Sequence, residues 1–167
     1  MRLAVIAFGK LKTPGLREAC EHYKAHLKPW AALEEIELKP IPVPDKSPAT
    51  RKKIQEKESL LLFEKLESRF MGGRGAFYLL DERGKALETL KWSELVQSWE
   101  SSGSTDIALC IGSSLGFSSE VRARAKGMLS LGPQTLPHEL ARVVLCEQLF
   151  RAYSVIRGHP YHNEGSG

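Results

Sequence analysis

Closely spaced cysteines and long apolar runs are both missing from this sequence. The three cysteines, Cys20, Cys110 and Cys146, lie far apart, so no Cys-x-x-Cys pair is available for zinc binding or thiol–disulfide exchange. A scattered, odd set of cysteines is typical of a reducing cytoplasm. No run approaches the ~18 apolar residues of a membrane span, and the N-terminal apolar stretch is too short for a secretory signal. We therefore expect a cytoplasmic protein with neither disulfides nor a membrane segment.

Metal-ligand clusters and the common phosphate-binding motifs are missing as well. His159 and His162 stand close together, but Pro160 between them prevents a regular helical face and no third ligand is evident, so no metal site is expected. No Gly-Lys-Ser/Thr follows a glycine loop, which excludes a Walker A loop. Neither residues 72–75 nor residues 112–116 give the Gly-x-Gly-x-x-Gly turn of a dinucleotide-binding strand and helix.

Net charge gives a weaker indication. The chain has 167 residues, enough for one domain with a sizeable core, and its 24 basic and 20 acidic residues leave a net charge of +4. This mild basic surplus fits a nucleic-acid partner, and it fits an ordinary solvated surface equally well. Part of the surplus stands at the start of a predicted long helix, at Arg51, Lys52, Lys53 and Lys57.

Apolar runs alternate with helix-like periodicity along the chain. The runs predict strands at 2–8, 33–41, 76–80 and 106–111, and the periodic segments predict helices at 14–29, 47–70, 91–100, 118–128 and 137–157. The strand at 76–80 is expected to close in the turn Asp-Glu-Arg-Gly-Lys, and Ser118 or Ser119 to cap the helix that follows. This order is typical of an α/β fold with a mostly parallel sheet flanked by helices on both faces.

The last predicted helix is apolar on more than one side. One stripe contains Val143, Cys146, Phe150 and Tyr153, and another contains Leu145, Leu149, Ala152 and Ile156. Such a helix needs cover on more than one side. Burial inside the chain and contact with a partner subunit both satisfy this need.

The loop at 111–116 contains Gly112, Ser114 and Gly116, the Gly-x-Ser-x-Gly pattern of a serine-hydrolase nucleophile elbow. It follows a predicted strand and precedes a predicted helix, as an elbow requires. However, every aspartate precedes Ser114, and only ~50 residues follow it, which leaves little room for the strands that carry the acid and base of such enzymes. A hydrolase using Ser114 is therefore the less favoured alternative.

Three segments favour a ligand pocket instead. They are the loop at 112–116, the irregular stretch 131–137 and the end of the strand at 76–80. Parallel sheets bind ligands at the carboxyl ends of their strands. Side by side, these segments would offer backbone groups to an adenine, with apolar walls from Leu80, Leu115 and Leu136. Glycine loops are common in such folds, so composition alone leaves the ordinary loop as an alternative.

The C-terminal region combines basic and aromatic residues. Between 120 and 162 the basic residues are Arg122, Arg124, Lys126, Arg142, Arg151 and Arg157. Arginines beside a tail with Tyr161 and His162 suit phosphate contacts and base stacking. A solvated helix face with a frayed end has the same composition.

Residues 135–164, TLPHELARVVLCEQLFRAYSVIRGHPYHNE, closely resemble the C-terminus of the RlmH family of SPOUT-superfamily methyltransferases. The resemblance extends over the whole chain through RLAVIAFGK, YLLDERGK, IGSSLG and LSLGPQTLPH. It implies methylation of N3 of a pseudouridine in large-subunit (23S) ribosomal RNA. The implied methyl donor is S-adenosyl-L-methionine, and the implied substrate is the assembled ribosome with the pseudouridine already made.

The resemblance also implies an architecture. It predicts one SPOUT methyltransferase domain over residues 1–167, a deep C-terminal trefoil knot that binds the cofactor within roughly residues 76–160, and a homodimer that packs the last helix. Knots are nearly absent from proteins, so no local pattern predicts one. The positions that match the family's cofactor contacts are Leu80, Gly112, Ser113, Gly116, Gly132, Pro133, Gln134, Thr135, Leu136 and Pro137.

The expected chemistry places its demand on the nucleophile. The N3–H of a pseudouridine is an imide proton that must leave before the nitrogen attacks, and His162 is of the residue type that exchanges protons near neutral pH. Tyr161 would stack on or orient the base, and Arg151 with Arg142 would stabilise negative charge on a uracil oxygen. The residues expected to contact RNA are His138, Arg142 and Arg157.

Two departures from the family pattern affect these expectations. Ser113, Ser114 and Leu115 stand where the family usually has Gly-Pro-Glu, and Asn163 stands where it usually has arginine. Ser113 suits backbone contacts to a cofactor if its φ is negative or its strain is tolerated. The missing arginine removes a bidentate contact to phosphate or base. A ribosome- or RNA-binding SPOUT protein with altered catalysis is therefore a further alternative.

Overall fold

The computed structural model describes residues 1–70, 75–104 and 106–162. Strands and helices alternate along these ranges. The elements are β1 (Arg2–Phe8), α1 (Leu16–Leu27), β2 (Ala32–Leu38), α2 (Pro48–Arg69), β3 (Gly75–Ala86), α3 (Thr89–Ser101), β4 (Asp106–Ile111), α4 (Ser119–Arg124), β5 (Gly127–Ser130) and α5 (His138–Ile156).

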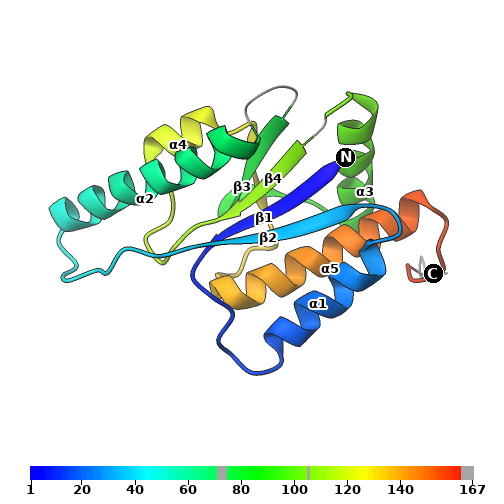
Figure 1. Ribbon diagram of the computed structural model, residues 1–167, viewed down its shortest axis with the longest axis horizontal. Helices are drawn as coiled ribbons and strands as arrows, with labels where there is room; N and C mark the ends of the chain where they lie inside the picture. Colours follow the sequence, from blue (N-terminus) through cyan, green and yellow to red (C-terminus); the bar gives the residue numbers. More distant parts are fainter. Residues whose placement is uncertain (71–74, 105, 163–167) are drawn as a thin grey trace.

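Within the described ranges, five strands run parallel in one sheet, in the order β2-β1-β4-β3-β5 (Figure 1). Successive residues of β1 face opposite sides of this sheet. Leu3 and Val5 pack in a core cluster with α1, α3 and α5, whereas Ala4 and Ile6 pack in a second cluster with α2 and α4. The predicted α/β class, a parallel sheet with helices on both faces, is confirmed. The trefoil knot stays a prediction.

β3 is longer than its apolar run indicates. It does not close after Leu80 but continues to Ala86, with a register shift against β5 between Leu80 and Lys85. Gly84 makes this continuation possible, because a Cβ there would lie only 2.7 Å from backbone atoms of Leu129 in β5. The expected turn at this point is therefore wrong.

The segment after β4 also differs from the expectation. The helix expected at 118–128 ends at Arg124, and β5, which is missing from the predicted strands, follows it. A four-residue strand is too short for apolar periodicity to reveal. The expected cap is confirmed at Ser118, whose side chain accepts a hydrogen bond from the N–H of Val121 at 3.2 Å.

α5 packs between α1 and α3, which cover both of its apolar stripes within the chain. Leu145 lies in the core cluster that contains α3, Cys146 packs beside Cys20 of α1, and Phe150 stacks on Trp30 with ring centroids 5.7 Å apart. Burial inside the chain therefore accounts for the stripes without a partner subunit.

Neither a membrane helix nor a metal cluster is found among the described residues. No helix there is long and apolar enough to cross a bilayer. No group of three or more His, Cys, Asp or Glu side chains in those ranges is placed to hold a metal ion.

Candidate cofactor cavity and C-terminal cluster

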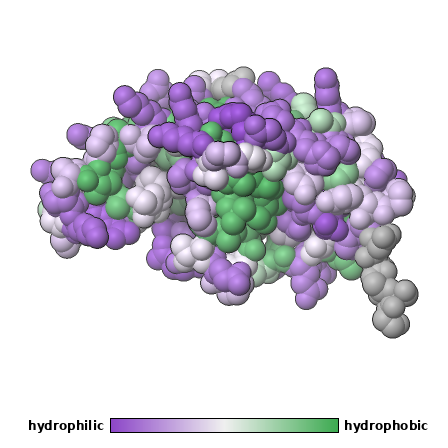
Figure 2. Space-filling model, turned by 90° about the horizontal axis from the view of Figure 1, so that it is seen from below, coloured by the Kyte–Doolittle hydropathy of each residue, from purple (hydrophilic) through white to green (hydrophobic). Residues whose placement is uncertain are grey.

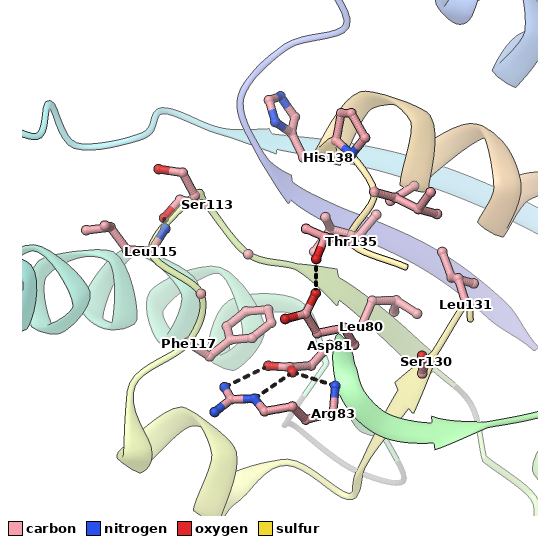
Figure 3. Close-up of a pocket in the computed structure, with 18 of the residues that line it drawn as sticks. Leu80, Asp81, Arg83, Ser113, Leu115, Phe117, Ser130, Leu131, Thr135 and His138 are labelled. Atoms are coloured by element: carbon pink, nitrogen blue, oxygen red, sulfur yellow. Dashed lines mark hydrogen bonds and ion pairs between the residues drawn. The ribbon is translucent and has the colours of Figure 1, made fainter. Parts of the chain in front are cut away.

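A cavity of about 790 Å³ opens at the carboxyl ends of β3 and β4 (Figure 3). Its walls come mainly from residues 80–83 of β3, residues 111–117 after β4, and the connection between β5 and α5. Sequence reasoning singled out these same three segments. Of the ten positions expected to contact a cofactor, all but Pro133 line the cavity.

The loop after β4 is a tight turn. The N–H of Gly116 donates to the carbonyl of Ser113 at 2.9 Å, and the N–H of Leu115 donates to the Ser113 hydroxyl at 3.3 Å. Gly116 has a φ of +69°, a conformation that favours glycine. Among the described residues no other type has a positive φ, so Ser113 fits its position without backbone strain.

Helix α2 holds this loop in place. Gln55 donates its side-chain amide to the carbonyl of Leu115 at 2.7 Å, and Ser113 donates its hydroxyl to Glu58 at 2.6 Å. Glu58 is buried, and it also accepts the N–H of Ile41 at 3.2 Å. Sequence reasoning missed these α2 residues, because nothing local indicates that a distant helix supports the loop.

Ser114 has no catalytic partners among the residues that the structure describes. Its side chain is exposed, and no hydrogen bond joins its hydroxyl to a histidine or a carboxylate within the described part of the chain. A nucleophile elbow also leads straight into a helix, whereas α4 begins only at Ser119. The geometry therefore gives the hydrolase alternative no support.

The β3 side of the cavity carries charges of both signs. Asp81 forms ion pairs with Arg122 of α4 at 2.8 Å and with Arg83 at 3.1 Å. Burial opposes ionisation of Asp81, but hydrogen bonds from Arg83 and the charge of Arg122 outweigh it and hold its pKa below the ordinary value. The neighbouring Glu82 accepts a hydrogen bond from the hydroxyl of Thr135, which joins β3 to the loop before α5 (Figure 3).

The loop between β5 and α5 is held at its first residues. Gly132 has a φ of +142°, and the Ser130 side chain both donates to its carbonyl at 2.6 Å and accepts its N–H at 3.1 Å. Leu131 and Leu136 are half-buried and supply apolar walls. His138, expected to contact RNA, is exposed at the start of α5 and lines the same cavity.

The three expected catalytic residues form a second cluster at the far end of α5. The Arg151 guanidinium lies 3.4 Å from Nδ1 of His162 and 4.7 Å from the ring centroid of Tyr161. Both Arg151 and the Tyr161 hydroxyl bind the Glu147 carboxylate, at 2.8 and 3.1 Å. Burial, together with the charge of Glu147, raises the pKa of Tyr161 to about 12. Sequence reasoning did not single out Glu147.

The C-terminal cluster lies away from the cavity of its own chain. None of Arg151, Tyr161 and His162 lines the cavity. His138 does line the cavity, and Arg151 follows it by 13 positions in the same helix. At 1.5 Å per residue, the two residues lie about 20 Å apart along the helix axis. Figure 1 shows α5 running from the loop end of the sheet to the opposite end.

The structure corrects the expected role of Arg142. It is 1% exposed, and its guanidinium binds Glu35 and Glu37 of β2 and the carbonyl of Gly9. It is therefore a buried structural cation, and the expectation that it contacts RNA or the reacting base is wrong. Arg157 remains half-exposed and pairs with Glu100 at 3.2 Å. Asn163, the position of the missing family arginine, lies outside the described residues.

Comparison with known proteins first defines a class. The fold is similar to that of a methylase family protein from Haemophilus influenzae Rd KW20, with a TM-score of 0.57 over 95% of this chain and 67% of that one. The identity is 11%, so this likeness shows the fold alone.

Sequence comparison then gives the family. The family model described as "Predicted SPOUT methyltransferase" matches residues 1–162. A protein named ribosomal RNA large subunit methyltransferase H from Dechloromonas aromatica is 37% identical over 99% of this chain and 100% of its own length. One of the same name from Carboxydothermus hydrogenoformans is 36% identical over 97% and 99%. The chain belongs to the SPOUT methyltransferase family, whose methyl donor is S-adenosylmethionine, and the inferred resemblance is confirmed.

Proposed function

We propose that this chain transfers a methyl group from S-adenosylmethionine to N3 of a pseudouridine in 23S ribosomal RNA, on assembled ribosomes in the cytoplasm. The observation that carries the proposal is the cavity, where all but one of the expected cofactor positions meet. The names of full-length relatives support large-subunit RNA as the substrate. The choice of a pseudouridine rests on the family resemblance.

The cavity residues fit the cofactor. Its volume of about 790 Å³ lies within the range of roughly 300–1,000 Å³ that is usual for ligand sites. Leu80, Leu131 and Leu136 provide apolar walls for an adenine, while glycine-rich backbone at 112–116 provides hydrogen-bonding groups. Asp81 and Glu82 also line the β3 side, and Arg83 and Arg122 balance their charge. When bound, S-adenosylmethionine supplies an electrophilic methyl group whose leaving group is a neutral thioether.

The chain's own residues then have to position the base and remove a proton. His162 would accept the N3 proton of the pseudouridine, and Tyr161 would stack on the base. Arg151, which contacts both side chains, would hold them together and stabilise negative charge on the uracil ring. Attack requires the methyl group about 3–3.5 Å from the nitrogen, so the tail must lie at a cofactor cavity.

A homodimer would bring together the cavity and the C-terminal cluster, which lie apart within one chain. Because the cavity and the tail flank the two ends of α5, two α5 helices packed antiparallel place the tail of each subunit at the cavity of the other. The outward side of α5 offers apolar contact for this packing at Leu140, which is 38% exposed, and at the half-buried Val144. Figure 2, viewed from the side of α1 and α5, shows an apolar patch near the middle of a mostly hydrophilic face.

Labelled methyl transfer tests the proposal directly. The protein is incubated with radiolabelled S-adenosylmethionine and ribosomes from a strain that lacks this methylation, and the label is located after digestion of the RNA. Label on N3 of one large-subunit pseudouridine is the expected result. Absence of label in any ribosomal RNA, with cofactor binding intact by calorimetry, contradicts the proposal and favours a binding protein with altered catalysis.

A further inference from the structure

A concentration of positive charge at the start of α2 has no role in the site described so far. Lys46, Arg51, Lys52, Lys53 and Lys57 form what we define as the α2 cationic end. Between 45 and 57 only Asp45 and Glu56 oppose them, so this segment has a surplus of three positive charges, against +4 for the whole chain.

These cations are exposed and lack acidic partners in the part of the chain that the structure describes. All five are exposed to solvent, and none forms an ion pair among the described residues. Asp45 is engaged instead in capping α2, where it accepts from the N–H of Ser47 at 2.7 Å and from the hydroxyl of Thr50 at 2.9 Å. Many other cations of the chain are paired, as in Arg83 with Asp81 and Arg157 with Glu100. Clustered, unneutralised charge of one sign attracts a polyanion.

The position of the cluster connects it to the cavity. Arg51 lines the cavity and donates to the carbonyl of Leu115 at 3.4 Å, and one turn later Gln55 donates to the same carbonyl at 2.7 Å. The first turns of α2 are therefore fixed relative to the loop that closes one wall of the cavity. A ligand bound by this end of α2 is held at a defined distance from the reacting groups.

The charge balance of the cavity makes such a contact useful. Along the β3 side, Asp81 and Glu82 balance Arg83 and Arg122, so this side has no surplus of positive charge to hold the phosphates that accompany a target base. Cations at the start of α2 supply that positive charge. Phosphate contacts of this kind position an RNA and do not read its sequence.

We propose that the α2 cationic end binds the phosphate backbone of the RNA strand next to the methylated nucleotide. This inference rests on the proposed function, because it takes RNA as the substrate. The partner it fits is a single-stranded or looped RNA segment whose phosphates reach Lys52 and Lys53 while the base lies at the cavity.

The test uses a double variant and a matched control. Lys52→Gln/Lys53→Gln removes two charges beside the cavity. Lys65→Gln/Lys126→Gln also removes two charges, but Lys65 lies 13 positions after Lys52 in α2, about 20 Å along the helix. Lys126 just precedes the first residue of β5, whereas the cavity is lined from Ser130, at the other end of that strand. The dissociation constant for unmethylated ribosomes is measured between 50 and 200 mM salt, and cofactor affinity is measured by calorimetry.

The expected result is a change in salt dependence for one variant only. Each lost phosphate contact lowers the slope of log affinity against log salt by about 0.7 for a single strand, so Lys52→Gln/Lys53→Gln loses about 1.4 and binds roughly tenfold more weakly near 0.15 M salt. The control keeps the slope of the unmodified protein, and all three proteins bind the cofactor equally.

Two outcomes overturn the inference. One is an unchanged slope in Lys52→Gln/Lys53→Gln, and the other is an equal loss in the control, which would indicate a general charge effect. Failure of the proposed function is distinguishable, because it would show as absence of methyl transfer in the unmodified protein. If the unmodified protein methylates ribosomes and the salt slope of Lys52→Gln/Lys53→Gln is unchanged, only the α2 contact is refuted.

Discussion

The separation of cavity and tail predicts that catalysis requires two subunits, and paired variants can test this. Leu136→Arg places a long cationic side chain in the cavity and should abolish cofactor binding, while His162→Ala removes the expected base from the tail. Leu136 lies in a loop and is half-buried, so the fold should tolerate the change. Each variant alone should be inactive, since every site in its homodimer has one defective half.

The magnitude follows from counting sites in a heterodimer. A dimer of one Leu136→Arg subunit and one His162→Ala subunit has one fully intact site if the tail acts in trans, so about half of the unmodified activity should return. If the tail acted within its own chain, both sites would be defective and the activity would be absent. The heterodimer is isolated through two different affinity tags, and methyl transfer to unmethylated ribosomes is measured per dimer.

A reciprocal heterodimer provides the control. One subunit is unmodified, and its partner carries both Leu136→Arg and His162→Ala. Trans action then leaves no intact site and predicts no activity, whereas action within one chain predicts about half. Activity in this reciprocal dimer, together with none in the first, would refute the shared site and the distance argument on which it rests.

Other contacts make separate predictions. Arg142→Met should lower the free energy of unfolding in urea by about 3 kcal/mol, because Glu35 and Glu37 lose their buried cation and keep only Lys24 and Arg17; a loss under ~1 kcal/mol contradicts this. Burial is the largest single influence on the pKa of Glu35 and of Glu37 and raises it, but Arg142, together with Lys24 beside Glu35 and Arg17 beside Glu37, lowers both pKa values below the ordinary value. Their stabilisation is thus complete above the ordinary carboxyl pKa and is lost as pH falls through the lower folded values, so acid should destabilise Arg142→Met less steeply. Ser114→Ala should keep full methyl transfer, and a large loss would restore a role for that hydroxyl. His162→Ala should keep cofactor affinity by calorimetry but lose turnover, and unchanged turnover would exclude it as base.

The parallel sheet could be predicted because buried strands appear as continuous apolar runs. β4 is buried along its whole length, and β1 is buried from Leu3 to Phe8, so both stand out in the sequence. β5 and the second half of β3 do not stand out in the sequence, because their pairing depends on the close approach of Gly84 to Leu129. That contact joins residues of different elements, and no local pattern encodes it.

The cavity could be predicted only in part. Its loops were accessible because glycine-rich segments at the carboxyl ends of parallel strands are typical ligand sites. The residues that hold those loops in place could not be predicted, because Gln55 and Arg122 belong to other elements. The error at Arg142 had a usable signal: Glu35 and Glu37, two positions apart in β2, share one face of the strand, and two acids facing a helix predict a buried cation between them.

The proposed second subunit also has a signal in the sequence, which is the length of one helix. The segments TLPH and HPYH stand at the two ends of a predicted helix, and both belong to the expected site. A helix of 19 residues is a rigid spacer of about 28 Å, and the few residues after it cannot return over that distance, because Tyr161 is held against Glu147 and Phe150. The proposed site segments at the two ends of this helix can therefore meet only between two subunits, or after the tail detaches from α5. The heterodimers described above decide between these two arrangements.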